Sequence, residues 1–154
     1  MRNESVPRTK AGIVREGFDE DDAAANIRAL MFSQALSLKL HSGHLHDVSS
    51  IAVVGGAARN TFLRQAITDV FGAETYLIEN SDFAAPLGCA ISGARKLLGS
   101  TYEEATQLFV LREPASTMTP QPEYQPIYGK LLERYKALEE SHLKKRKEEA
   151  QANK

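Results

Sequence analysis

The sequence predicts an α/β domain in which helices and short parallel strands form layers. Three observations support this fold class. Stretches with helical apolar spacing alternate with two short β-branched runs, in the order helix, strand, helix, strand, helix. The first run, residues 50–54, is apolar at both odd and even positions, as in a strand that is buried on both faces of a parallel sheet. Glycine lies just beyond the end of each predicted core helix.

Residues 1–18 form a poorly patterned N-terminal segment, with a strand candidate at 11–14. A long helix is predicted over about 20–42, because apolar residues from Ile27 to Leu38 recur at helical spacing. The four carboxylates of residues 19–22 suit the positive end of the helix dipole in its first turn.

The other elements of the α/β core, which spans 19–112, are predicted from the same kinds of pattern. A strand at 50–54 leads into a helix over 60–71, and a second strand at 75–78 leads into a helix over 82–98. Four of the six prolines lie in 113–126, which predicts an extended connector. Residues 127–154 are predicted as a C-terminal helix and a charged tail.

Two strands do not make a stable sheet, since both would be edges with unpaired backbone groups. The missing neighbours can come from the N-terminal segment, from another chain, or from a larger protein of which these 154 residues are a piece. We favour the last of these, because the strand at 50–54 has the composition of a central strand.

Composition narrows the class of protein. The chain has 19 basic and 20 acidic residues and a net charge of -1, which gives no basic footprint for nucleic acid. Cys89 is the one cysteine, so a disulfide framework is excluded. No apolar run is long enough to span a membrane, and the first ten residues lack the apolar core of a signal peptide. We therefore expect a cytoplasmic protein that binds neither nucleic acid nor membrane.

The main chemical motif is a glycine pair, Gly55-Gly56, between the first strand and the next helix. Glycine permits positive φ and lets a ligand approach bare backbone, and the helix start offers unpaired N–H groups. Asn60 can both donate to and accept from an adenine edge. The third glycine of a dinucleotide fingerprint and the Gly-Lys-Ser/Thr of a P-loop are absent. A simple tight turn, with Asn60 as a helix cap, explains the same residues.

Other candidates have simpler structural explanations. His41, His44, His46 and Asp47 lie at a predicted helix end and its loop, where polar residues are expected without a metal. Cys89 lies between Gly88 and Ala90 and is predicted to be a small core residue.

The basic run at 144–147 adjoins two glutamates, which is typical of a solvated helix end.

The segment from Val54 to Asn60, with the residues at 63–65 and 68–71, resembles the C-terminal domain of FGGY-type carbohydrate kinases. The small-residue helix at 84–90 is similar to that family's Ala-rich helix, and the tail from Pro122 to Leu138 is similar to the closing helix of its xylulokinases. The resemblance runs from about residue 24 to 140 and covers the last third of a family member.

The resemblance implies part of an actin-like ATPase (ribonuclease H-like) fold, with ATP between two domains. It places Gly55, Gly56, Ala57 and Asn60 on the adenine side of the nucleotide site. ATP and Mg²⁺ are the implied cofactors. The resemblance puts the catalytic aspartate and the sugar site in an N-terminal domain, so we expect this chain alone to be inactive. The alternative is a non-catalytic module from a truncated kinase that binds a partner or forms a homodimer.

Overall fold

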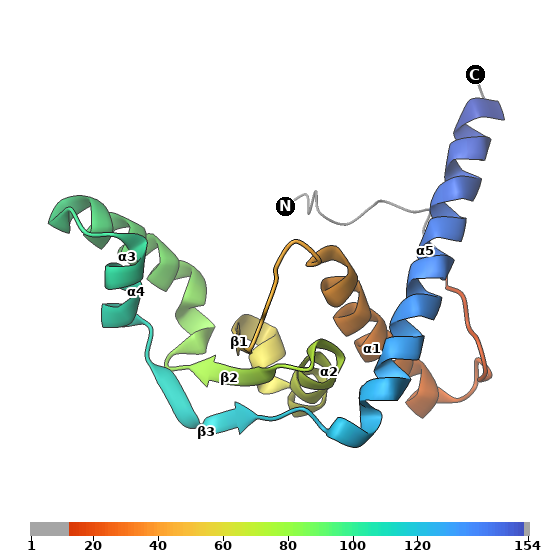
Figure 1. The fold of residues 1–154 in the computed structure, drawn as a ribbon, viewed down its shortest axis with the longest axis horizontal. Coiled ribbons are helices and arrows are strands. Elements are labelled where there is room, and N and C mark those ends of the chain that lie inside the picture. Colours follow the sequence, from red (N-terminus) through yellow and green to blue (C-terminus); the bar gives the residue numbers. More distant parts are fainter. Residues whose placement is uncertain (1–12, 153–154) are drawn as a thin grey trace. The chain divides into compact units, whose positions relative to one another are not determined.

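The computed structural model describes residues 13–152, which fall into two compact units. Residues 13–47 and 121–152 belong to one unit, which we call the two-helix unit. Residues 48–120 belong to the other, which we call the sheet unit. Figure 1 labels the helices and strands of both.

The two-helix unit consists of α1 (Ala23–His41) packed on α5 (Gln125–Ala152), which follows the short helix η3 (Pro122–Tyr124). The rings of Phe32 and Tyr128 lie with their centroids 5.4 Å apart. Nearer the end of α1, His41 Nε2 lies 2.9 Å from a carboxylate oxygen of Glu139. An aromatic contact and a polar contact thus join α1 and α5 at two different points along their lengths.

The predicted acidic first turn of the long helix is wrong. α1 begins at Ala23, and the carboxylates at 19–21 precede it. Asp22 is the N-cap, and its side chain accepts a hydrogen bond of 2.9 Å from the Ala25 N–H. A carboxylate in the capping position satisfies an orphan amide directly, which a carboxylate within the first turn would not do in this way.

The sheet unit has eight elements. In chain order they are β1 (Ser50–Val53), η1 (Gly55–Arg59), α2 (Thr61–Phe71), β2 (Glu74–Ile78), η2 (Ser81–Phe83), α3 (Ala84–Leu98), α4 (Tyr102–Phe109) and β3 (Arg112–Met118). β1 pairs with β2 in parallel, from Ser50 opposite Glu74 to Val53 opposite Leu77. β3 pairs with the other side of β2 and is antiparallel to it, so the strand order is β1-β2-β3. The predicted α/β class and the parallel strand pair are confirmed.

Two expectations about the sheet need correction. The predicted proline-rich connector at 113–126 contains a strand, β3, which adds a third strand to the two that the sequence predicts within this chain. Within residues 13–152, β1 pairs with β2 alone and lies at an edge, whereas its composition predicts a central strand. Residues 13 and 14, the described part of the N-terminal strand candidate, are not in a strand, and 11–12 lie outside the described residues.

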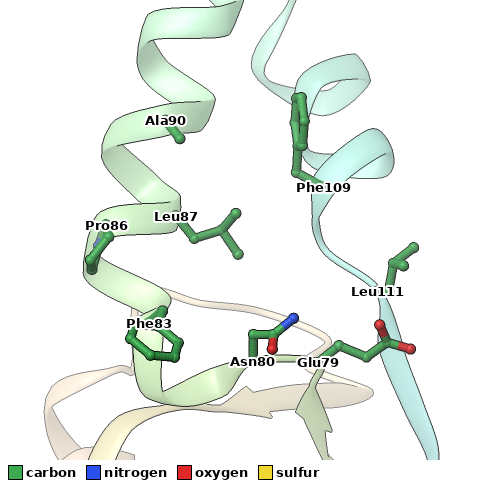
Figure 2. A pocket seen from close by; sticks show the side chains of 8 residues that line it. All are labelled: Glu79, Asn80, Phe83, Pro86, Leu87, Ala90, Phe109 and Leu111. Carbon is green, nitrogen blue, oxygen red and sulfur yellow. The ribbon is translucent and has the colours of Figure 1, made fainter.

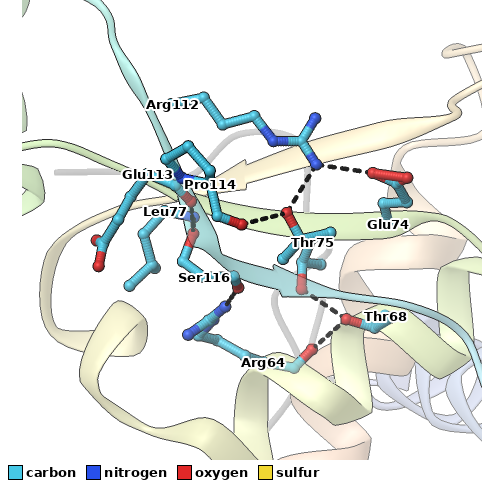
Figure 3. A network of polar contacts seen from close by, with 10 residues as sticks. Arg64, Thr68, Glu74, Thr75, Leu77, Arg112, Glu113, Pro114 and Ser116 are labelled. Atoms are coloured by element: carbon cyan, nitrogen blue, oxygen red, sulfur yellow. Dashed lines mark hydrogen bonds and ion pairs between the residues drawn. The ribbon is translucent and has the colours of Figure 1, made fainter.

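α2 covers the sheet with most of the apolar stripe that its spacing predicts, but Phe62, which the same spacing puts in the buried stripe, is 42% exposed. Ala66, Ile67 and Val70 are all buried, and Gly72 ends the helix in the left-handed conformation, with φ of 65°. Beneath the helix, the hydroxyls of Thr68 and Thr75 lie 2.6 Å apart, and both side chains are fully buried. Figure 3 shows this pair as part of a polar network that ties α2 to β2 and β3.

Arg64 extends that network to β3. Its guanidinium donates to the Ser116 carbonyl, and the Ser116 hydroxyl accepts from the Leu77 N–H at 2.8 Å (Figure 3). The Arg64 side chain is buried, so its contact lies out of water, where hydrogen bonds are stronger. No helix within residues 13–152 combines the length and the apolar character needed to cross a bilayer.

Candidate functional site

The glycine pair forms an open turn directly after β1. Gly55 has φ of 72°, a conformation that side chains with a Cβ rarely adopt. A Cβ built on either Gly55 or Gly56 would meet no heavy atom of the described residues within 4 Å. Close packing within the described part of the chain therefore does not explain why glycine occupies these two positions. What they leave is a stretch of accessible backbone at the carboxyl end of a parallel strand.

Asn60 joins this turn to α2. It is the N-cap of the helix, and its Oδ1 accepts a hydrogen bond of 2.9 Å from the Leu63 N–H. The side chain is half-buried, so the chain's own helices do not cover it completely. The structural role that the sequence suggests for Asn60, a helix cap, is confirmed. Ala57 lies in the same turn, within η1.

Arg59 links the glycine turn to the short helix η2, which follows β2. Its Nε donates to Asp82 Oδ1 at 3.3 Å, and a terminal guanidinium nitrogen donates to Asp82 Oδ2. The hydrogen bond to Asp82 and the attraction of that carboxylate raise the pKa of the Arg59 guanidinium above its ordinary value. Because Asp82 lies in η2, just after β2, the pair connects the turns that follow both parallel strands.

The carboxyl ends of parallel strands are where open α/β sheets bind their ligands. Here that edge carries exposed glycine backbone, a helix start and one ion pair. Backbone N–H and C=O groups can meet the edge of a planar base, and glycine allows the base to approach closely. The arrangement suits binding and positioning of a ligand.

The other sequence candidates have separate positions. His41 pairs with Glu139 in the two-helix unit, and no set of three metal-binding side chains is close enough together anywhere in residues 13–152. Cys89 is exposed on α3, so its prediction as a core residue is wrong. The basic residues 144–147 are exposed on α5, as predicted for a solvated helix end.

The sequence did not reveal a pocket in the sheet unit. It lies between the start of α3 and the segment that joins α4 to β3, and its polar residues are Glu79 and Asn80 (Figure 2). None of the four predicted site residues lines it. Asn80 has φ of 58° and makes no capping hydrogen bond through its side chain.

The fold is shared with solved sugar kinases. The ligand-bound xylulose kinase from Lactobacillus acidophilus superposes with a TM-score of 0.61 at 20% identity, over 81% of this chain and 26% of that one. The gluconate kinase from the same organism gives 0.60 at 22% identity, over 86% of this chain and 27% of that one. The fold is accordingly that of a part of an actin-like ATPase, as predicted.

Sequence relationships identify the family. The model of the C-terminal domain of the FGGY family of carbohydrate kinases matches residues 6–97. The xylulose kinase of Mus musculus is 32% identical over 119 residues, which are 74% of this chain. That of Rattus norvegicus is 32% identical over 124 residues, or 77% of this chain. The chain belongs to the FGGY family, and the predicted likeness to xylulose kinases is confirmed. It spans about a fifth of the length of these relatives, 21% and 23%.

Proposed function

We propose that this chain supplies the adenine-contacting part of the ATP site in a xylulokinase-like sugar kinase. The observation that carries the proposal is the open turn at Gly55-Gly56, whose backbone is accessible at the carboxyl end of β1. Family membership supports it, because a carbohydrate kinase needs a nucleotide site. Asn60 fixes the start of α2 beside the turn through its Oδ1, and its amide would donate to a purine acceptor.

The reaction proposed for the whole kinase is transfer of a phosphoryl group to a sugar hydroxyl. The hydroxyl oxygen forms a bond to the γ-phosphorus of ATP, while the bond from that phosphorus to the β,γ-bridging oxygen breaks, which releases ADP. The hydroxyl proton passes to an aspartate that we assign to a separate N-terminal domain of the whole kinase. We assign one role in this reaction to Gly55, Gly56, Ala57 and Asn60. They hold the adenine base, and this fixes the position of the phosphates for attack by the hydroxyl.

Mg²⁺ is implied by this reaction, and residues 13–152 bring together no group of three metal-binding side chains that would hold it without the nucleotide. We therefore assign no residue of this chain to the metal. We expect the chain by itself to bind ATP weakly and to transfer no phosphate. We also propose that the N-terminal domain binds a pentulose as the substrate and that the kinase is cytoplasmic.

An NMR titration of the ¹⁵N-labelled chain tests the nucleotide role. ATP at millimolar concentration should shift the amide signals of residues 55–60 more than any others. Inorganic triphosphate carries the phosphate charge without a base, and it should leave these signals almost unchanged. ATP shifts concentrated elsewhere in the chain would refute the assignment, as would equal responses to ATP and triphosphate.

The second candidate is a binding module without catalytic use, and one observation favours it. Large apolar side chains are exposed where α3 meets α4: Leu97 is 88%, Leu98 68% and Tyr102 56% accessible. Apolar surface of this kind marks interaction sites. Sedimentation velocity should then show a homodimer that Leu98→Glu dissociates, and a clean monomer at high concentration would count against this module.

A further inference from the structure

The pocket beside α3 has two apolar walls. Its volume is about 330 Å³. Figure 2 shows one wall on α3 and η2 and the other on the segment from α4 into β3. Six apolar residues line them: Phe83, Pro86, Leu87, Ala90, Phe109 and Leu111. Several of these side chains are largely exposed, including Phe83 at 65%. The walls therefore offer apolar surface that the chain itself leaves in contact with water.

One end of the pocket is polar. Glu79 and Asn80, which follow β2, lie there between the two walls (Figure 2). The Glu79 N–H donates to the Leu111 carbonyl at 2.9 Å and so ties the walls together at this end. Within residues 13–152, the Glu79 carboxylate makes no hydrogen bond and no ion pair. The pocket thus places an uncompensated negative charge and a carboxamide at one end of two apolar walls.

Size and charge define the ligand that would fit. Ligand pockets range from roughly 300 to 1,000 Å³, so this one suits a single ring or a short branched chain. None of its eight lining residues is basic, and a phosphate or carboxylate would be repelled by Glu79. An ammonium group would instead donate a charge-assisted hydrogen bond to the Glu79 carboxylate, while its apolar body contacts the walls.

We propose that this pocket is a binding site for a small primary amine with an apolar ring or branched body. The site differs from the glycine turn in its residues and in the sign of the charge that it prefers. It also extends beyond the family match, because Phe109 and Leu111 lie outside residues 6–97. Its occupancy therefore does not depend on the nucleotide role of the glycine turn.

Three probes of similar shape test the proposal at neutral pH by NMR titration of the full chain. They are 2-phenylethylamine, which is cationic, 2-phenylethanol, which is neutral, and 3-phenylpropanoate, which is anionic. We expect the amine to bind most tightly and the acid most weakly, with shifts at the residues of the pocket. Equal affinities for the three probes would overturn the proposal, since apolar contact alone would then explain binding.

Variants assign the charge preference to one side chain. Glu79→Gln should weaken binding of the amine about tenfold and leave binding of the alcohol unchanged. Glu103→Gln, which neutralises another exposed carboxylate in the same unit, should change neither. A Glu79→Gln chain that binds the amine as tightly as the parent would overturn the proposal.

Filling the pocket provides a second readout. Ala90→Leu adds volume to the α3 wall and should weaken binding of both the amine and the alcohol. Should this variant fail to fold, Glu79→Gln still decides the proposal, because Glu79 is exposed and its replacement leaves the walls intact. A homodimer in sedimentation that Ala90→Leu abolishes would show that a second copy occupies the pocket, and this too would overturn the proposal.

Discussion

Arg59 and Asp82 are 23 positions apart in sequence, and their side chains join the turns that follow the two parallel strands. Two donors of one guanidinium meet two oxygens of one carboxylate, a geometry that fixes orientation as well as distance. The turn on one side is the one that contains Gly55 and Gly56. A contact between two exposed side chains therefore restrains the backbone that we assign to the nucleotide.

Removal of this contact should loosen the glycine turn without unfolding the chain. In Asp82→Asn the carboxylate charge is lost, and amide exchange at residues 56–59 should become about threefold faster, while the thermal midpoint changes little because both partners are exposed. Hydrogen–deuterium exchange measures both the turn and the rest of the chain. The swapped pair, Arg59→Asp with Asp82→Arg, should restore part of the protection. Exchange rates that stay unchanged in Asp82→Asn would mean that the turn needs no such restraint.

A side chain at Gly56 should block the nucleotide and spare the fold. A Cβ at this position meets open space, so Gly56→Val is sterically tolerated in the chain itself. Its methyl groups would occupy the approach to the backbone, and ATP binding should weaken at least about tenfold. The matched control is Gly93→Ala on α3, where a Cβ also meets open space and ATP binding should be unaffected. Undiminished ATP shifts in Gly56→Val would place the base somewhere else.

The parts of this fold that the sequence predicts are those with local causes. The helix at 61–71 has its cap, Asn60, and its end, Gly72, within the same short segment. The turn at 55–59 is likewise predicted by its two adjacent glycines. Such signals depend on neighbours along the chain, so no knowledge of the packed structure is needed to interpret them.

β3 could not be predicted in the same way, because its causes are distant. Pro114 argues against a strand, but residues 114–117 lie where the pairing with β2 is irregular, and an edge position needs no ladder donor there. The strand is held by Arg64, which is 52 positions away and donates to the Ser116 carbonyl. The Arg59–Asp82 pair and the pocket could not be predicted for the same reason, because each brings together residues that are far apart in the sequence.

The buried threonine pair gives an asymmetric prediction. Thr68 donates its hydroxyl hydrogen to the Arg64 carbonyl at 2.8 Å, so in the 2.6 Å contact between the threonines Thr75 is the donor (Figure 3). Thr75→Val removes that donor and should cost about 1 kcal/mol of unfolding free energy. Thr68→Val leaves the Thr75 hydroxyl buried without an acceptor and should cost about 2 kcal/mol.

Urea denaturation measures the difference between these two variants. Thr106→Val, at an exposed position on α4, serves as the control and should change the unfolding free energy little. The double variant Thr68→Val with Thr75→Val should cost less than the sum of the single variants, because no hydroxyl is left unpaired. Equal losses from the single variants would contradict the donor direction stated here.

α4 was not predicted, although its start carries a recognisable signal. The Thr101 hydroxyl accepts from the Glu104 N–H at 3.2 Å, and the Glu104 carboxylate accepts from the Thr101 N–H at 2.8 Å. This is a capping box, and the spacing of threonine and glutamate three residues apart is visible in the sequence. The backbone hydrogen bond from Thr101, with that from its hydroxyl, lowers the pKa of Glu104 below its ordinary value of 4.5.

The lowered pKa makes the stability of α4 depend on pH in a fixed direction. Glu104 binds a proton more weakly in the folded chain than in the unfolded chain, so its contribution is complete above pH 4.5 and is lost as the pH falls through the folded pKa. Glu104→Ala should therefore be less stable than the parent at pH 7, and the difference should become smaller as the pH is lowered to 3. Glu103→Ala, which removes the neighbouring carboxylate outside the capping box, controls for the loss of charge. Urea denaturation curves at pH 7 and pH 3 test this expectation. If Glu104→Ala lowers the unfolding free energy as much at pH 3 as at pH 7, the Glu104 side chain acts through packing and not through its charge.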